Sequence, residues 1–384
     1  MANSVLPFAQ SEPHTLGVEM ELQLIHPGTL DLNPVAPQII QRWADRDSHV
    51  KPELLQSMIE VNTGVCRDAH EVDRDLRATL DVLVALARDA GARLASNGTH
   101  ATARHWERLL YPSPRYQDLI DRNQFIARRL MIFGLHVHVG ARDGHHCIWM
   151  SNGFLHYLPH LLALSASSPF WEGQDTGLAS SRITVFEALP TGGHPCAVAT
   201  WDDFQSLVRK LVRSRAIRDL KDIWWDIRPS PKFGTIEIRV CDGLPTVSET
   251  VALTALIHCL AISFDEHIAA GLQPPMLPDW LIRENKWRAS RHGLDADLVV
   301  DNEGNSRPLR DELNDMLDRL SPIAETLGYE RYFDLIRGPM MSRPPYLRQR
   351  DVFRSTGNLT QVTASVIAEF EEDLQSAARM DRGA

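Results

Sequence analysis

Cysteine is scarce in this sequence, and its five cysteines follow no ligand pattern. They are odd in number, widely separated and free of Cys-x-x-Cys spacing, at Cys66, Cys147, Cys196, Cys241 and Cys259. This distribution argues against a disulfide framework and gives no indication of a thiolate zinc site. It is typical of reduced thiols in a cytoplasmic protein, and at each position a small buried side chain is favoured over a catalytic thiol.

The sequence also lacks the features of several other protein classes. It has neither a Gly-x-x-x-x-Gly-Lys-Ser/Thr loop nor a Rossmann glycine fingerprint, so a nucleotide would have to bind to another fold. The formal net charge of −10 argues against a general nucleic-acid-binding protein. The most apolar stretch, residues 251–264, is too short to span a membrane and predicts a buried helix. Residues 1–10 have no basic start and no apolar run, so we expect no signal peptide.

What remains is the composition of a soluble globular protein, long enough for one large domain or two ordinary ones. The chain has 384 residues, of which 43% are hydrophobic and 23% charged, and no repeat or linker divides it. Short strands with polar faces occupy the first two thirds, and helices dominate the last third. This order predicts the α+β class and one domain over residues 1–384, with a core at about 15–375.

The first of these strands, residues 17–24, alternates apolar and polar side chains. Val18, Met20 and Leu22 share one face, and Glu19 and Glu21 share the other. The two carboxylates then lie about 7 Å apart at Cα. Like charges at that separation repel each other unless they are solvated or share a cation. A single Glu-x-Glu is more often a solvent-facing edge strand, so the case for a cation depends on the later strands.

Three later segments carry the same kind of polar face. Their side chains are Glu53, Glu60, His136, His138, Glu237 and Arg239. Five carboxylates with one or two imidazoles and no thiolates suit a hard divalent cation, Mg²⁺ or Mn²⁺. Carboxylate-held Mg²⁺ usually binds substrate phosphates as well, which indicates ATP.

Apolar periodicity and turn residues predict the remaining elements. Helices are expected over residues 37–46, 68–91, 115–129, 147–165, 202–216, 246–270, 279–292, 311–328 and 359–378. Pro159 predicts a kink or break in its helix. Residues 94–99 and 183–189 are candidate strands, and the Gly- and Ser-rich residues 170–182 are expected to form a functional loop.

Five motifs occur in order along the chain, at residues 17–22, 60–64, 134–140, 175–182 and 224–239. Together they resemble the bacterial ATP-dependent carboxylate–amine ligases of the glutamate–cysteine ligase type 2 family. The resemblance runs from about residue 15 to about residue 370. It implies a fold like the catalytic domain of glutamine synthetase, in which a curved, mainly antiparallel sheet forms a funnel with helices outside. It also implies that ATP activates the γ-carboxylate of glutamate to an acyl phosphate, which cysteine or another amine attacks.

The resemblance also implies roles for individual residues. One metal ion would be held by Glu21, Glu53 and Glu60, and a second, which bridges the ATP phosphates, by Glu19, His136 and Glu237. Arg239 resembles the arginine that neutralises the transferring phosphoryl group. Two positions depart from the family pattern: Met20 replaces a usual acidic residue, and Ala101 replaces a usual proline, which leaves the role of His100 open.

Several side chains have two readings that the sequence leaves open. Arg182 and Arg228 either hold the substrate α-carboxylate in bidentate contacts or pair with nearby acids. His138 is either a further ligand or a hydrogen-bonded sheet residue. A basic cluster near a loop either contacts ATP phosphates or forms a solvated helix face; it comprises Lys286, Arg288 and Arg291.

Two rival functions also stay open: a non-catalytic metal- or nucleotide-binding relative, and a metal-dependent hydrolase. The expected partners are small molecules, namely glutamate, an amine and ATP, with neither nucleic acid nor membrane among them. A homo-oligomer is compatible with the sequence, and the sequence does not identify the physiological amine.

Overall fold

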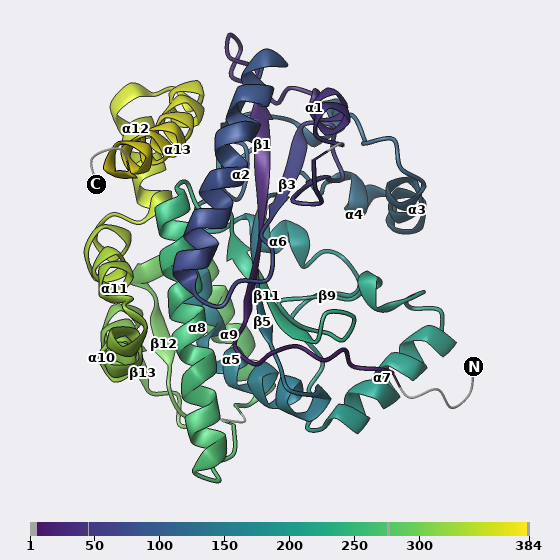
Figure 1. Ribbon diagram of the computed structural model, residues 1–384, viewed down its shortest axis with the longest axis vertical. Coiled ribbons are helices and arrows are strands. Elements are labelled where there is room, and N and C mark those ends of the chain that lie inside the picture. The colour runs from purple at the N-terminus through teal and green to yellow at the C-terminus, as the bar shows by residue number, and fades with distance from the viewer. Residues whose placement is uncertain (1–5, 45, 275–276, 382–384) are drawn as a thin grey trace.

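A mainly antiparallel sheet forms the centre of the protein in the computed structural model, which describes residues 6–44, 46–274 and 277–381 (Figure 1). The strand order is β10 (Ile227–Ser230), β11 (Thr235–Asp242), β5 (Gly134–Gly140), β1 (Leu16–Ile25), β3 (Met58–Asn62) and β2 (Val50–Pro52), and β4 (Arg93–Ala95) also pairs with β1. Every pairing in this sheet is antiparallel. The first strand in the sequence is therefore a central strand of the sheet.

One face of this sheet is apolar and is covered by long helices. Val18, Met20 and Leu22 of β1 are each at most 1% exposed and belong to the main hydrophobic core. The covering helices are α2 (Ala69–Asp89), α5 (Gly144–Ser165) and α8 (Val247–Ala269), and α2 runs beside β1 in Figure 1. Each fully buried aliphatic side chain of this core contributes about 1.5–3 kcal/mol relative to exposure.

Helix α8 contains the most apolar stretch of the sequence. By length and composition it is one helix that could cross a membrane, but 83% of its most apolar window is buried inside the fold. It packs against α2, α5, α10, α11 and α13. The prediction of a buried helix over this stretch is confirmed.

The remaining helices and short strands surround this core. The helices are α1 (Ala36–Trp43), α3 (Pro114–Asn123), α4 (Phe125–Arg128), α6 (Arg182–Phe186), α7 (Trp201–Arg213), α9 (Asp279–His292), α10 (Leu309–Leu327), α11 (Glu330–Leu335), α12 (Pro345–Thr356) and α13 (Leu359–Asp381). Single turns lie at His105–Glu107, Leu220–Asp222, Gly293–Asp295 and Ile336–Met340. Short strand pairs are β6 (Phe170–Trp171) with β7 (Gln174–Asp175), β8 (Gly192–Gly193) with β9 (Trp224–Trp225), and β12 (Asp297–Val299) with β13 (Ser306–Pro308). This mixture of an open, mainly antiparallel sheet and packed helices confirms the α+β class.

Local sequence signals explain where several helices begin and end. Asp68 caps α2, since its carboxylate accepts a hydrogen bond from the Glu71 N–H at 2.8 Å. Gly91 then follows α2 with a φ of 75°, a conformation that glycine adopts without steric cost. Helix α5 continues through Pro159, so of the kink or break predicted there, the break does not occur. The helix expected over residues 115–129 is instead divided at Gln124, where φ is 47°.

The strand predicted over residues 183–189 is wrong, because this segment begins inside helix α6 (Arg182–Phe186). Its β-branched residues favour a strand by local propensity, but the helix places Arg182, Ile183 and Phe186 in buried positions. Tertiary burial therefore overrides propensity here. The strand expected over residues 94–99 is also shorter than predicted and ends at Ala95.

Candidate active site

The polar face of the sheet lines a cavity of about 690 Å³. Most of the predicted site residues line it, namely Glu19, Glu21, Glu53, Glu60, His136, Arg182, Arg228 and Arg239. Glu237 lies behind this lining and has no exposed surface. The alternation of β1 thus separates the acidic cavity floor from the apolar core on the other side of the same strand.

The strand register brings residues that are distant in sequence next to each other. Glu19 of β1 pairs with His136 of β5, and Glu21 pairs with Glu60 of β3. On the other side of β5, His138 pairs with Glu237 of β11. Three adjacent strands, β1, β5 and β11, therefore project Glu19, His136 and Glu237 into one space.

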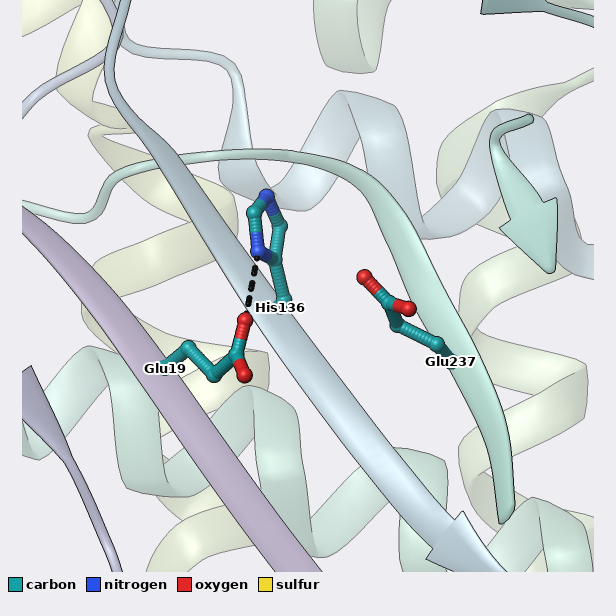
Figure 2. Close-up of side chains that lie close together, drawn as sticks. All are labelled: Glu19, His136 and Glu237. Atoms are coloured by element: carbon teal, nitrogen blue, oxygen red, sulfur yellow. Dashed lines mark hydrogen bonds and ion pairs between the residues drawn. The ribbon is translucent and has the colours of Figure 1, made fainter. Parts of the chain in front are cut away.

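Figure 2 shows these three side chains converging from their strands. His136 Nδ1 lies 3.1 Å from Glu19 Oε2, and one ligand atom from each of the three residues lies within 4.8 Å of the others. No other group of three or more His, Cys, Asp or Glu side chains in the described ranges is as compact. This trio is the set that the family resemblance implies for the phosphate-bridging metal.

His138 stands at the edge of the trio. Its Nε2 lies 3.7 Å from Glu19 Oε1 and 3.9 Å from Glu237 Oε2, while its Nδ1 lies 2.8 Å from Thr235 Oγ1. Burial alone would raise the pKa of Glu19, but the hydrogen bond with His136 and the close approach of His138 lower it well below its usual range. Both histidines therefore stabilise Glu19 as a carboxylate.

Two arginines hold the buried carboxylate of Glu237. Arg228 approaches Glu237 Oε2 with Nη2 at 2.5 Å and Nε at 2.9 Å, and Arg239 donates to Oε1 from Nη1. Burial by itself would raise the pKa of Glu237, but the positive charges of Arg228 and Arg239 outweigh it and hold the pKa below its usual range. Glu237 is therefore ionised at neutral pH, and Arg228 pairs with an acid in this structure.

The second predicted ligand set, Glu21, Glu53 and Glu60, lines the same cavity without forming a compact trio. Burial, followed by the negative charge of Glu21, raises the pKa of Glu53 to about 7. Burial and the charges of Glu19 and Glu53 raise the pKa of Glu60 well above its usual range. Lys51 Nζ lies 3.7 Å from Glu60 and only partly offsets this repulsion. Burial and the neighbouring carboxylates therefore oppose the ionisation of Glu53 and Glu60 in the metal-free protein.

This charge distribution fits a hard divalent cation. The donors in the compact trio are the partly buried carboxylate of Glu19, the buried carboxylate of Glu237 and a single imidazole, a set that suits Mg²⁺ or Mn²⁺. Burial lowers the pKa of His136, so its imidazole is available in the neutral, ligating form. A cation at the floor would also relieve the repulsion among Glu21, Glu53 and Glu60.

A glycine of one motif makes room for these groups. At Gly134 a Cβ atom would lie 3.0 Å from His136 Nε2 and would collide with the Arg182 guanidinium. The backbone N–H of Gly134 also donates a hydrogen bond to Glu21 Oε2. Arg182 is 2% exposed, and its Nη2 donates to the Arg239 carbonyl oxygen at 3.3 Å.

The basic cluster predicted to contact ATP lies outside the cavity lining. Lys286 is buried against Glu187 and Asp226, Arg288 pairs with Glu284 on its own helix at 2.7 Å, and Arg291 donates to the Gly177 carbonyl oxygen. His100 is likewise occupied elsewhere, with Nε2 3.0 Å from the Leu30 carbonyl oxygen.

Other cations line the cavity, and sequence reasoning did not select them. They are Lys51, Arg115, Arg122, Arg218, Lys221 and Lys232. Of these, Lys232 lies inside one of the five motifs, residues 224–239, and this position is a sequence signal that could have selected it as a site residue. The others have no local signal, because single basic residues on loops and helix surfaces are common.

The fold is similar to that of several solved protein structures. Glutamate–cysteine ligase from Francisella tularensis in complex with AMP superposes with a TM-score of 0.65 at 11% identity, over 97% of this chain and 95% of that one. A bifunctional glutathione synthetase from Pasteurella multocida gives a TM-score of 0.67 at 13% identity, over 94% and 53% of the two chains. The Pup ligase PafA in complex with Pup gives 0.52 at 14% identity, over 91% and 72%. At these identities the likeness is one of fold.

Sequence comparison then gives the family. The model described as Glutamate-cysteine ligase family 2 (GCS2) matches residues 15–341, and the chain belongs to this family. A relative from Bdellovibrio bacteriovorus is 51% identical over 369 residues, which cover 96% of this chain and 98% of the relative. One from Thermobifida fusca is 42% identical over 370 residues, with coverage of 95% and 93%. Both are provisionally named glutamate–cysteine ligase 2. The resemblance inferred from the five motifs is confirmed.

Proposed function

We propose that this protein is an ATP-dependent carboxylate–amine ligase that joins the γ-carboxylate of glutamate to cysteine or another amine and releases ADP and phosphate. The observation that carries the proposal is the compact trio of Glu19, His136 and Glu237 with Arg228 and Arg239 against it, at the floor of a cavity. Family membership and the names of its relatives support the same reaction class.

The ligands on the cavity floor suit two divalent cations. Glu19, His136 and Glu237 would hold one, and Glu21, Glu53 and Glu60 would hold the other. When bound, Mg²⁺ or Mn²⁺ supplies positive charge that neutralises the phosphate oxygens of ATP. The ionised state of Glu19 and Glu237 prepares the first site for a cation.

The reaction that we propose has two steps. A γ-carboxylate oxygen of glutamate attacks the γ-phosphorus of ATP, the bond to the β,γ-bridging oxygen breaks, and ADP leaves. The amine nitrogen then attacks the acyl carbon of the resulting acyl phosphate, the carbon–oxygen bond to phosphate breaks, and the nitrogen loses a proton. The guanidinium group of Arg239 is planar and always positively charged, so it can bridge two phosphoryl oxygens during the first step.

The roles of the other predicted binding residues are narrower proposals. Arg182 and Arg228 line the cavity, so a contact with the α-carboxylate of glutamate stays a prediction for both. For ATP phosphates, the cavity-lining Lys51 and Lys232 are better placed than the basic cluster on α9.

The test is an ADP-release screen with the purified protein, Mg²⁺, ATP, glutamate and a panel of amino acids and amines, with mass spectrometry of the product. We expect ADP release that requires both glutamate and an amine, together with a γ-glutamyl product. Exposed Arg209 on α7, replaced by alanine, serves as a control that should leave the rate unchanged. ADP release without glutamate or amine would indicate a hydrolase, and no release with any acceptor would indicate a non-catalytic relative.

The acyl phosphate step has a separate test. Positional isotope exchange in ATP should require glutamate and proceed without an amine, because phosphoryl transfer to the γ-carboxylate is reversible. Fast overall turnover without any exchange would count against the stepwise route.

A further inference from the structure

Lys286 is a buried cation that has no role in the reaction proposed for the cavity. It lies on α9 and is 3% exposed. Its Nζ lies 2.5 Å from Asp226 Oδ2 and also contacts Glu187 Oε1. Burying an ammonium group is costly unless carboxylates compensate its charge, and here two do so. The two carboxylates belong to segments that are far apart in sequence, and both segments reach Arg239.

The first segment reaches Arg239 through its backbone. Asp226 has no exposed surface and lies between β9 and β10. Its carbonyl oxygen accepts a hydrogen bond from the Arg239 N–H at 2.8 Å. The pairing of β11 with β5 shifts register between Ile238 and Cys241, so Arg239 lies in an irregular part of its strand. Bulges of this kind change the direction of a side chain, so the Asp226 contact helps to set where Arg239 points.

The second segment reaches Arg239 through its side chain. Glu187 follows directly after α6, whose last residue is Phe186. The Arg239 guanidinium lies 5.9 Å from the centre of the Phe186 ring, and the Arg182 guanidinium lies 5.6 Å from it. Both distances are within the range of a cation–π contact. A shift of Glu187 would therefore move the ring on which Arg239 rests.

We propose that Lys286 is a positioning residue for Arg239. By bridging Asp226 and Glu187, its ammonium group fixes both the backbone contact and the aromatic surface that hold the Arg239 guanidinium against Glu237. Lys286 thus acts behind the cavity, which differs from the direct contact with ATP predicted from the sequence. The kinetic readout of this inference rests on the proposed ligase function, whereas its structural readout does not.

The kinetic test is Lys286→Met, which removes the charge and keeps a flexible side chain of similar length. We expect kcat to fall by about 10- to 100-fold, as for partners that orient catalytic ligands. In an Arg239→Ala background the same substitution should change kcat by no more than about twofold, because its effect passes through Arg239. A lysine that binds ATP would instead raise the KM for ATP and would lower kcat/KM in both backgrounds, which would overturn the proposal.

The matched control is Arg348→Met. Arg348 also bridges two carboxylates, Glu249 at 2.9 Å and Glu369 at 2.8 Å, and it does not belong to the cavity lining. We expect a loss of thermal stability like that of Lys286→Met, with kcat within about twofold of the wild type. Equal losses of kcat in the two variants would reduce Lys286 to a structural ion pair and overturn the inference.

If Lys286→Met does not fold, Glu187→Gln tests the same link, since the Glu187 side chain is 40% exposed and tolerates substitution more readily. The smaller loss of kcat expected for Glu187→Gln should also disappear in the Arg239→Ala background, and a loss that persists there would refute the link.

Crystal structures separate this inference from the proposed function. Even if the wild type releases no ADP with any acceptor, Arg239 should be displaced from Glu237 in the folded variant, and an unmoved Arg239 would overturn the inference.

Discussion

Replacing Glu53 with glutamine should stabilise the metal-free protein at pH 8 while weakening its response to a divalent cation. Burial and the charge of Glu21 raise the pKa of Glu53 from its ordinary 4.5 to about 7. Between these two values the folded protein binds a proton that the unfolded chain has released. Stability is therefore lost as the pH rises from about 4.5 to about 7 and stays reduced above it. Glutamine has nearly the same shape and cannot ionise, so the loss should disappear.

The size of this loss of stability follows from the pKa shift of Glu53. At about 1.4 kcal/mol for each pKa unit, the full loss above pH 7 is about 3 kcal/mol. Since Glu53 lines an open cavity, solvent screening should reduce the recovered free energy of unfolding to about 1–2 kcal/mol. A chain of 384 residues has an unfolding entropy of about 0.8 kcal/mol/K. The expected rise in Tm is about 1–3 °C.

Calorimetry of EDTA-treated protein at pH 8 and pH 5, with and without added Mg²⁺, provides the assay. The gain in the free energy of unfolding of Glu53→Gln over the wild type should be about fourfold smaller at pH 5 than at pH 8. At pH 5 the Glu53 carboxyl of the folded wild type is already protonated. Mg²⁺ at pH 8 should stabilise the wild type more than the variant. Exposed Glu325 on α10, replaced by glutamine, controls for general charge removal. A variant that is no more stable at pH 8, or whose gain is undiminished at pH 5, would refute the reasoning.

Three further predictions concern the metal and the paired charges around Glu237. EDTA should abolish ADP formation and added Mg²⁺ or Mn²⁺ should restore it; full activity in metal-free protein would contradict the metal assignment. Arg239→Ala should lower kcat by about 10²–10³-fold, roughly 3–4 kcal/mol, with partial rescue at best by Arg239→Lys. A variant that melts several degrees lower yet turns over at the wild-type rate would make Arg239 structural. Glu237→Gln leaves the half-buried guanidinium groups of Arg228 and Arg239 without their counterion and should lower the free energy of unfolding by about 2–3 kcal/mol, measured by denaturant titration; an unchanged midpoint would be incompatible with this pairing.

The sequence was sufficient for features that depend on neighbouring residues. The alternation in β1 separated Glu19 and Glu21 from Met20, because successive side chains of a strand point to opposite faces. Asp68 and Gly91 marked the limits of α2, because a cap and a positive φ are local requirements. The five motifs identified the family, and with it the α+β fold around an antiparallel sheet.

Tertiary structure decided which of these groups meet. Glu19, His136 and Glu237 converge only because β5 pairs with β1 on one side and with β11 on the other, and no local pattern specifies that register. The same holds for residues 183–189, whose burial selects a helix over their strand propensity. Lys286 shows the difference most clearly. Its spacing to Arg288 and Arg291 resembled a phosphate-binding cluster, but packing of α9 places its ammonium group between Asp226 and Glu187. The charge environment of a side chain is set by segments distant in sequence, so only the folded chain could assign Lys286 to the support of Arg239.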